Sequence, residues 1–145
     1  MTLDHAVALS LQDDLPRIGL TDRLRSDDPE LLESAALGLS DAREVRLRAL
    51  ERGIGVVAWH ERRFPAGLLG TTDCAPVLWY RGDLATLTLP AVAIVGSRAA
   101  SAVALEIAGR MAEGLAACGV AVVSGLARGV DYAVDDNNAK LLDES

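Results

Sequence analysis

The chain has 145 residues, half of them hydrophobic, and a formal net charge of −7. This length suits one medium domain or two small ones. The acidity argues against indiscriminate binding of polyanions, because non-specific affinity for nucleic acid comes largely from Lys and Arg. Residues 90–145 contain four basic and seven acidic residues, which gives this segment a net charge of −3. The remaining net charge of −4 lies in residues 1–89. Any contact with nucleic acid must therefore use a concentrated patch.

Residues 1–52 read as short helices. Asp28 before Pro29 predicts a helix start, with Asp28 as N-cap and Pro29 at the first position, and Ser40 predicts the cap of a later helix that Gly53 ends. The string LPRIGL at residues 15–20 resembles the hairpin of helix-hairpin-helix modules, although Arg17 replaces one hairpin glycine. We predict a small N-terminal helical domain, SAM-like or helix-hairpin-helix-like, whose hairpin is better suited to packing than to DNA contact.

Residues 53–89 form a predicted connector with two short strands, 56–59 and 77–80, separated by prolines. Most of the aromatic residues lie here, and stacking on the bases of a single strand is one interpretation. Packing is the favoured one, because Trp79 and Tyr80 must point to opposite faces of one strand and at least one of them must be buried.

Residues 90–145 contain a strand, a helix and a second strand. The run 91–95 ends at Gly96, Ser101 is a plausible N-cap, Gly119 sits where a left-handed residue ends a helix, and 120–123 is the second strand. Val103, Ile107, Met111 and Leu115 recur at helical spacing, with Ala104, Ala108 and Ala112 beside them, so one face of this helix is predicted to be apolar. The predicted fold class is therefore α/β, with the helical domain followed by an incomplete Rossmann-like βαβ unit, because a doubly wound sheet needs more than two strands.

The two loops that follow these strands are predicted to lie side by side at the carboxyl edge of the sheet, where open α/β sheets bind ligands. Glycines let the backbone come close to an anion, and free N–H groups can bind it. Arg98 and Arg128 add forked cations that suit phosphate, and Asp131 has a predicted structural role. The predicted phosphate-binding residues are Gly96, Ser97, Arg98, Ser124, Gly125, Ala127, Arg128 and Gly129.

Other ligands are disfavoured by the motifs. Arg98 stands where the dinucleotide fingerprint needs its second glycine, and no P-loop string occurs, so neither NAD nor ATP is expected as a cofactor. The two cysteines and two histidines lack metal-ligand spacing, so no metal is predicted. Neither a signal peptide nor a membrane-spanning run is seen, so the expected location is the cytoplasm.

The two loop motifs together are specific. VAIVGSR at residues 92–98 and VVSGLARGVD at 122–131, preceded by RFPAGL at 63–68 and APVLWYRGD at 75–83, resemble the DNA-processing protein A family, also called Smf. The visible resemblance runs from Gly53 to Asp131. It implies single-stranded DNA binding at the loop residues named above and delivery of the strand to a RecA-type recombinase in natural transformation. Such a protein is a mediator of DNA recombination and not an enzyme.

Two alternatives stay open. One is an enzyme, a Rossmann-like nucleotide phosphoribohydrolase, although the Pro-Gly-Gly-x-Gly-Thr loop of that group is absent and no paired carboxylate or nucleophile–base set replaces it. The other is a truncated fragment that acts only as a protein-interaction module, pairing its open sheet with a second copy or with a full-length relative.

Overall fold

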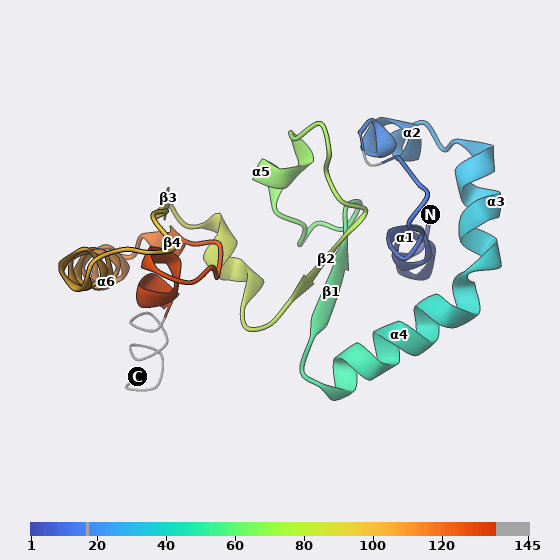
Figure 1. The fold of residues 1–145 in the computed structure, drawn as a ribbon. Coiled ribbons are helices and arrows are strands. Elements are labelled where there is room, and N and C mark those ends of the chain that lie inside the picture. Colours follow the sequence, from blue (N-terminus) through green and yellow to red (C-terminus); the bar gives the residue numbers. More distant parts are fainter. Residues whose placement is uncertain (17, 136–145) are drawn as a thin grey trace. The chain divides into compact units, whose positions relative to one another are not determined.

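The computed structural model describes residues 1–16 and 18–135, the side chain of Thr21 excepted. The described chain is mixed α/β, which confirms the predicted fold class. It divides into two compact units, Met1–Leu84 and Ala85–Ser145 (Figure 1). Within the described part of the chain, no helix combines the length and apolar character that crossing a membrane requires.

The first unit contains helices and one β-hairpin. The antiparallel hairpin pairs β1 with β2 from Gly55 opposite Tyr80 to Ala58 opposite Val77. The elements in chain order are α1 (Leu3–Ser10), α2 (Leu20–Arg25), α3 (Pro29–Leu37), α4 (Leu39–Glu51), β1 (Gly55–Ala58), α5 (Ala66–Leu69) and β2 (Val77–Tyr80). A 3₁₀ helix, η1 (Leu84–Thr88), follows.

Two of the three predicted helix boundaries are confirmed. Asp28 caps α3 by accepting a hydrogen bond from the Glu30 amide at 3.0 Å, and Gly53 follows α4 in the left-handed conformation at φ +67°. The predicted cap at Ser40 is wrong, because Gly38 alone separates α3 from α4 and Ser40 already lies inside α4. Two helices joined this directly leave no extended residue for a serine cap.

The hairpin and the helices of this unit share one hydrophobic core. Helix α1 is buried along Ala6–Leu9 and packs against α3 and α4, and Ala58 and Val77 from the two strands join the same cluster. The predicted division into 1–52, 53–89 and 90–145 stays a prediction, although β1 and β2 pack on the helices. The LPRIGL hairpin includes Arg17, which lies outside the described residues.

Successive side chains of β2 enter different clusters. Trp79 packs against the helical core, whereas Tyr80 packs against a second cluster formed by Val57, Phe64, Cys74 and Leu84. This confirms that the two aromatic residues point to opposite faces. Both therefore contribute to packing.

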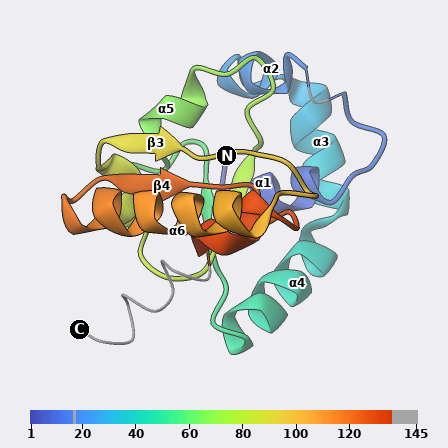
Figure 2. The ribbon, with the colours of Figure 1, turned by 60° about the vertical axis from the view of Figure 1, so that its left-hand side comes forward.

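The second unit is a βαβ crossover. Strands β3 (Ala91–Ala93) and β4 (Ala121–Val123) are parallel, and α6 (Ala102–Ala117) connects them and runs alongside (Figure 2). The Ser101 hydroxyl accepts a hydrogen bond from the Ala104 amide at 3.3 Å, and Gly119 has φ +73°. Both predicted ends of this helix are confirmed.

Only part of the predicted apolar face of α6 is buried. The helix packs through Ala108, Gly109 and Ala112, whereas the side chains of Val103, Ile107 and Met111 are 66%, 55% and 55% exposed. Cys118, which follows the helix, is exposed too. The small residues allow the helix to approach the strands closely, so the bulkier ones project beside β3, whose second edge has no paired strand among the described residues. An apolar hollow of about 440 Å³ lies there, with Val92, Ile107 and Met111 in its lining.

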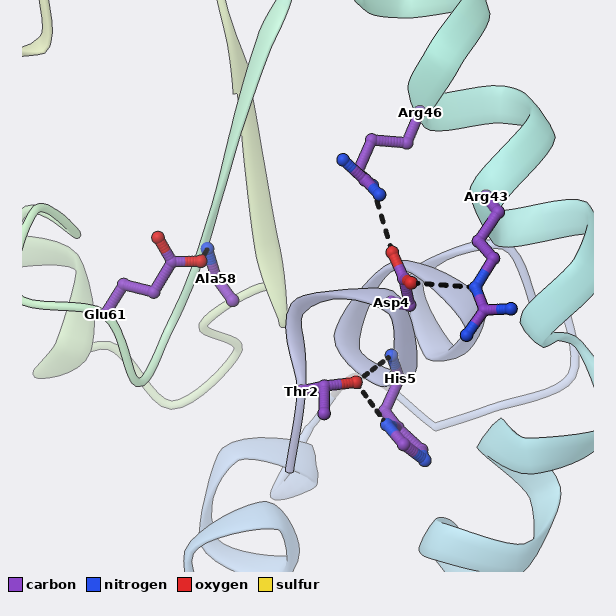
Figure 3. A network of polar contacts seen from close by, with 7 residues as sticks. All are labelled: Thr2, Asp4, His5, Arg43, Arg46, Ala58 and Glu61. Carbon is purple, nitrogen blue, oxygen red and sulfur yellow. Dashed lines mark hydrogen bonds and ion pairs between the residues drawn. The ribbon is translucent and has the colours of Figure 1, made fainter.

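Asp4 in the first turn of α1 joins two arginines of α4 (Figure 3). Its carboxylate accepts hydrogen bonds from Arg43 Nε at 3.0 Å and Arg46 Nε at 2.9 Å, and its side chain is only 18% exposed. Burial opposes ionisation of Asp4, but the hydrogen bonds and charges of Arg43 and Arg46 outweigh it, so the pKa of the Asp4 carboxyl lies below its ordinary value. Nearby, Glu61 accepts a hydrogen bond from the Ala58 amide (Figure 3).

We expect Asp4→Asn to lower the free energy of unfolding of the first unit at neutral pH. Because the folded pKa is depressed, the ion pairs stabilise the fold above the unfolded pKa, about 3.9, and this contribution disappears as the pH falls through the folded pKa. Urea denaturation of wild type and variant from neutral to acid pH should show curves that converge below about pH 4. Asp22→Asn is the control, since its pair with Arg25 is exposed and should contribute little; a constant difference across pH would contradict the assignment.

Candidate phosphate-binding site

The two loops after β3 and β4 touch through their backbones. We call residues 96–98 and 124–129 the rim. The Val130 amide donates to the Ser97 carbonyl at 3.3 Å, and a Cβ on Gly129 would lie 2.2 Å from Ser97 O and 2.8 Å from Arg98 Cα. Gly129 also has φ +91°, which other residues rarely adopt. The structure therefore brings the two predicted loops together, and only glycine fits at the contact.

The segment that follows the rim packs against both loops. Residues 130–135 are helical, and a Cβ on Gly96 would lie 2.6 Å from the Val130 side chain. A Cβ on Gly125 would lie 2.9 Å from an Asp131 carboxylate oxygen, and the Ser124 hydroxyl donates to the Asp131 carbonyl at 3.4 Å. The glycines of the rim thus allow this helical segment to approach both loops.

The cations of the rim face solvent. Arg98 and Arg128 are both exposed, and neither guanidinium forms an ion pair with a carboxylate in the described ranges 1–16 and 18–135. The Ser97 hydroxyl instead organises its own loop by accepting a hydrogen bond from the Ala99 amide at 3.1 Å. Ala127 is half-buried. Two exposed guanidinium groups, each able to donate two parallel hydrogen bonds, thus belong to the two glycine-rich loops.

Two residues at or next to the rim, Leu126 and Asp135, were not identified from the sequence. Leu126 lies at its tip with a positive φ of +55° and 83% exposure, a backbone conformation that is uncommon for leucine. Asp135 lies in the helical residues that follow the rim, and burial together with the charge of Asp131 raises the pKa of its carboxyl. One Asp135 oxygen is buried without a hydrogen-bond partner among the described residues. An i, i+4 search over 130–135 would have paired the two carboxylates, but no sequence signal marks the positive φ of Leu126.

Asp131 is buried at 7% exposure, in agreement with a structural role. Its carboxylate lies against Gly125 and, in the part of the chain described, forms no ion pair with Arg128. The Asp131 side chain is therefore buried, whereas the side chains of Arg98 and Arg128 are exposed. An anion can reach both guanidinium groups from solvent.

We expect Gly129→Ala to destabilise the second unit by more than about 1 kcal/mol, because its methyl group would collide with the Ser97 carbonyl and its φ is unfavourable. Hydrogen exchange of the amides in 91–135, followed by mass spectrometry, measures this. Gly114→Ala is the matched control: no atom lies within 4 Å of its added methyl group, so this change within α6 should stabilise the unit by about 0.5–1 kcal/mol. Unchanged exchange in Gly129→Ala would show that the loop contact is dispensable.

A known protein family matches the part of the chain that contains the rim. The model of the family described as DNA recombination-mediator protein A matches residues 55–140, which is more than half of the chain and includes the whole rim. The chain belongs to this family. The predicted resemblance is thereby confirmed, with one correction, because the match continues to residue 140, past the last recognisable motif at Asp131.

Two curated relatives align over about half of this chain. Protein Smf of Escherichia coli (strain K12) is 43% identical over 68 residues, which cover 47% of this chain and 18% of the relative. DNA processing protein DprA of Streptococcus pneumoniae (strain ATCC BAA-255 / R6) is 39% identical over 70 residues, 48% of this chain and 24% of the relative. The matched segment therefore spans less than a quarter of either relative.

A solved structure shows the same fold. The X-ray structure of DNA processing protein A (DprA) from Streptococcus pneumoniae matches with a TM-score of 0.67 and 20% sequence identity. The superposition covers 96% of this chain and 54% of that chain. Both units thus have counterparts in one larger protein.

Proposed function

We propose that this chain binds the sugar–phosphate backbone of single-stranded DNA at the rim. Arg98 and Arg128 pair with phosphates, and the backbone amides of the two glycine-rich loops donate further hydrogen bonds. The observation that carries the proposal is the contact of Gly129 with Ser97 and Arg98, which fixes two arginine-bearing loops at one edge of the sheet. The site comprises the residues predicted from sequence: Gly96, Ser97, Arg98, Ser124, Gly125, Ala127, Arg128 and Gly129.

The shape of the rim supports a single strand as the ligand. Reading a duplex by its base edges needs a helix or β-ribbon that enters a groove. The rim consists of two loops, and a flexible single strand can bring its phosphates to them. Exposed guanidinium groups suit this task, because neither Arg98 nor Arg128 has to give up an ion pair with a carboxylate of residues 1–16 or 18–135 before binding. The net charge of −7 means that attraction must be local.

The family supports the next step in the proposal. The matched family is described as a recombination mediator, and the pneumococcal relative is named as a DNA processing protein. We infer that the bound strand is passed to a RecA-type recombinase during natural transformation. In this role the chain breaks no covalent bond, so it acts as a mediator and not as an enzyme.

The first test is fluorescence anisotropy of a labelled single-stranded oligonucleotide. We expect Arg98→Ala to weaken binding by about 1.5–3 kcal/mol, the usual contribution of a hydrogen bond to a charged group. The salt dependence should also flatten, because each lost phosphate contact lowers the slope by about 0.7. Arg128→Ala should act in the same direction.

Arg110→Ala is the matched control, since it removes the same charge from an exposed position on α6 of the same unit. Equal losses of DNA affinity in Arg98→Ala and Arg110→Ala would mean that the rim arginines contribute only through their charge and not through a specific phosphate contact. Wild-type binding that Arg98→Ala and Arg128→Ala leave unchanged would contradict the proposal outright.

The mediator role has its own test. On single-stranded DNA coated with a single-strand-binding protein, the chain should shorten the lag before a RecA-type recombinase polymerises, and Arg98→Ala should lengthen it again. Filament growth on a fluorescently labelled strand reports this. Tight DNA binding with an unchanged lag would separate the two activities and leave this chain as a DNA-binding protein alone.

A further inference from the structure

A second candidate site lies on the first unit. A hollow of about 340 Å³ is bounded by α4, by the residues that follow it and by one aromatic side chain of β2. Its lining consists of Val45, Arg48, Ala49, Arg52, Ile54 and Trp79. We call this hollow the α4 groove.

The helical repeat explains why these residues meet. Positions 45, 48, 49 and 52 are spaced i, i+3, i+4 and i+7, so they share one face of α4 and of its C-cap. The chain then turns at Gly53 into β1, which brings Ile54 to the end of the groove. Trp79 comes from β2, which pairs with β1. The floor is apolar, and two guanidinium groups belong to one side.

The four arginines on this stretch divide into two kinds. Arg43 and Arg46 are held by the partly buried carboxylate of Asp4. Arg48 pairs with Glu44 at the surface, where the two side chains are 65% and 60% exposed, so a phosphate can displace the carboxylate at little cost. Arg52 is exposed and forms no ion pair within the described ranges.

Trp79 supplies a fixed aromatic surface. It packs against the helical core and also lines the groove, so its indole is held by the fold while part of it faces the hollow. A stacking platform held in this way loses little side-chain freedom on binding. Proteins that hold single strands combine such aromatic platforms with nearby cations.

We propose that the α4 groove binds one nucleotide of single-stranded DNA, with the base stacked on Trp79 and its phosphate held by Arg52 and Arg48. The forked guanidinium groups match phosphate, and the indole matches the flat face of any base. An acidic peptide with an apolar side chain shares part of this chemistry. The nucleotide is favoured because the hollow places an aromatic side chain beside two arginines and belongs to a member of a recombination-mediator family. The site is separate from the rim and goes beyond the function proposed for it.

The test uses the full chain and the indole N–H signals of its two tryptophans in ¹H–¹⁵N spectra. Titration with a short oligothymidylate should shift the Trp79 signal and leave that of Trp59, whose Nε1 is buried, in place. Trp79→Phe assigns the signals, and Trp59→Phe does so independently. Arg52→Ala should weaken the titration about tenfold, the equivalent of one charged hydrogen bond.

Arg62→Ala is the matched control, because Arg62 is an exposed arginine of the same unit outside the groove. The titration is repeated in the Arg98→Ala, Arg128→Ala double variant. A Trp79 shift that persists there supports the groove even if the rim fails, whereas anisotropy binding without any Trp79 shift overturns the groove and leaves the rim intact. A Trp79 shift caused by an Asp- and Leu-rich peptide at lower concentrations than by oligothymidylate would also overturn the nucleotide assignment.

Discussion

The approach of Gly129 to the backbone of Ser97 and Arg98 is the constraint on which the second unit depends. The two loops are separated in sequence by the whole of α6, and the parallel pairing of β3 with β4 brings their starting points to one edge. A side chain at position 129 would push them apart, since its Cβ would lie 2.2 Å from the Ser97 carbonyl. Because Gly129 has no Cβ, the loop that carries Arg128 can approach the loop that carries Arg98.

In the first unit, the arginines of α4 and its C-cap provide a local concentration of positive charge. A chain with net charge −7 can bind a polyanion only where arginines are concentrated and free. Helix α4 and its C-cap carry four arginines, and two of them, Arg43 and Arg46, form ion pairs with Asp4 that stabilise the fold. Arg48 and Arg52 remain on the groove side. One helix therefore serves both stability and the proposed recognition, because Arg43 and Arg46 bind Asp4 whereas Arg48 and Arg52 line the groove.

The proposals for the two units share one physical logic. Each combines forked cations with a surface that the fold holds in place: a glycine-rich backbone at the rim, and the indole of Trp79 in the α4 groove. The neighbouring carboxylates are either buried, as with Asp131 at the rim, or in exposed pairs that a phosphate can displace, as with Glu44 at the α4 groove. Local arrangement can thus offset an unfavourable total charge.

The sequence by itself determined the βαβ crossover, the strand of Trp79 and Tyr80, the Ser101 cap and the residues of the rim, because these follow from local hydrophobic period, capping chemistry and glycine-rich motifs. Tertiary structure decided which part of the apolar face of α6 packs, since the small residues Ala108 and Ala112 are buried whereas the larger residues Val103, Ile107 and Met111 are exposed. It also decided the α4 groove and the loop contact at Gly129. These features depend on the distance between segments remote in sequence, which no local pattern contains.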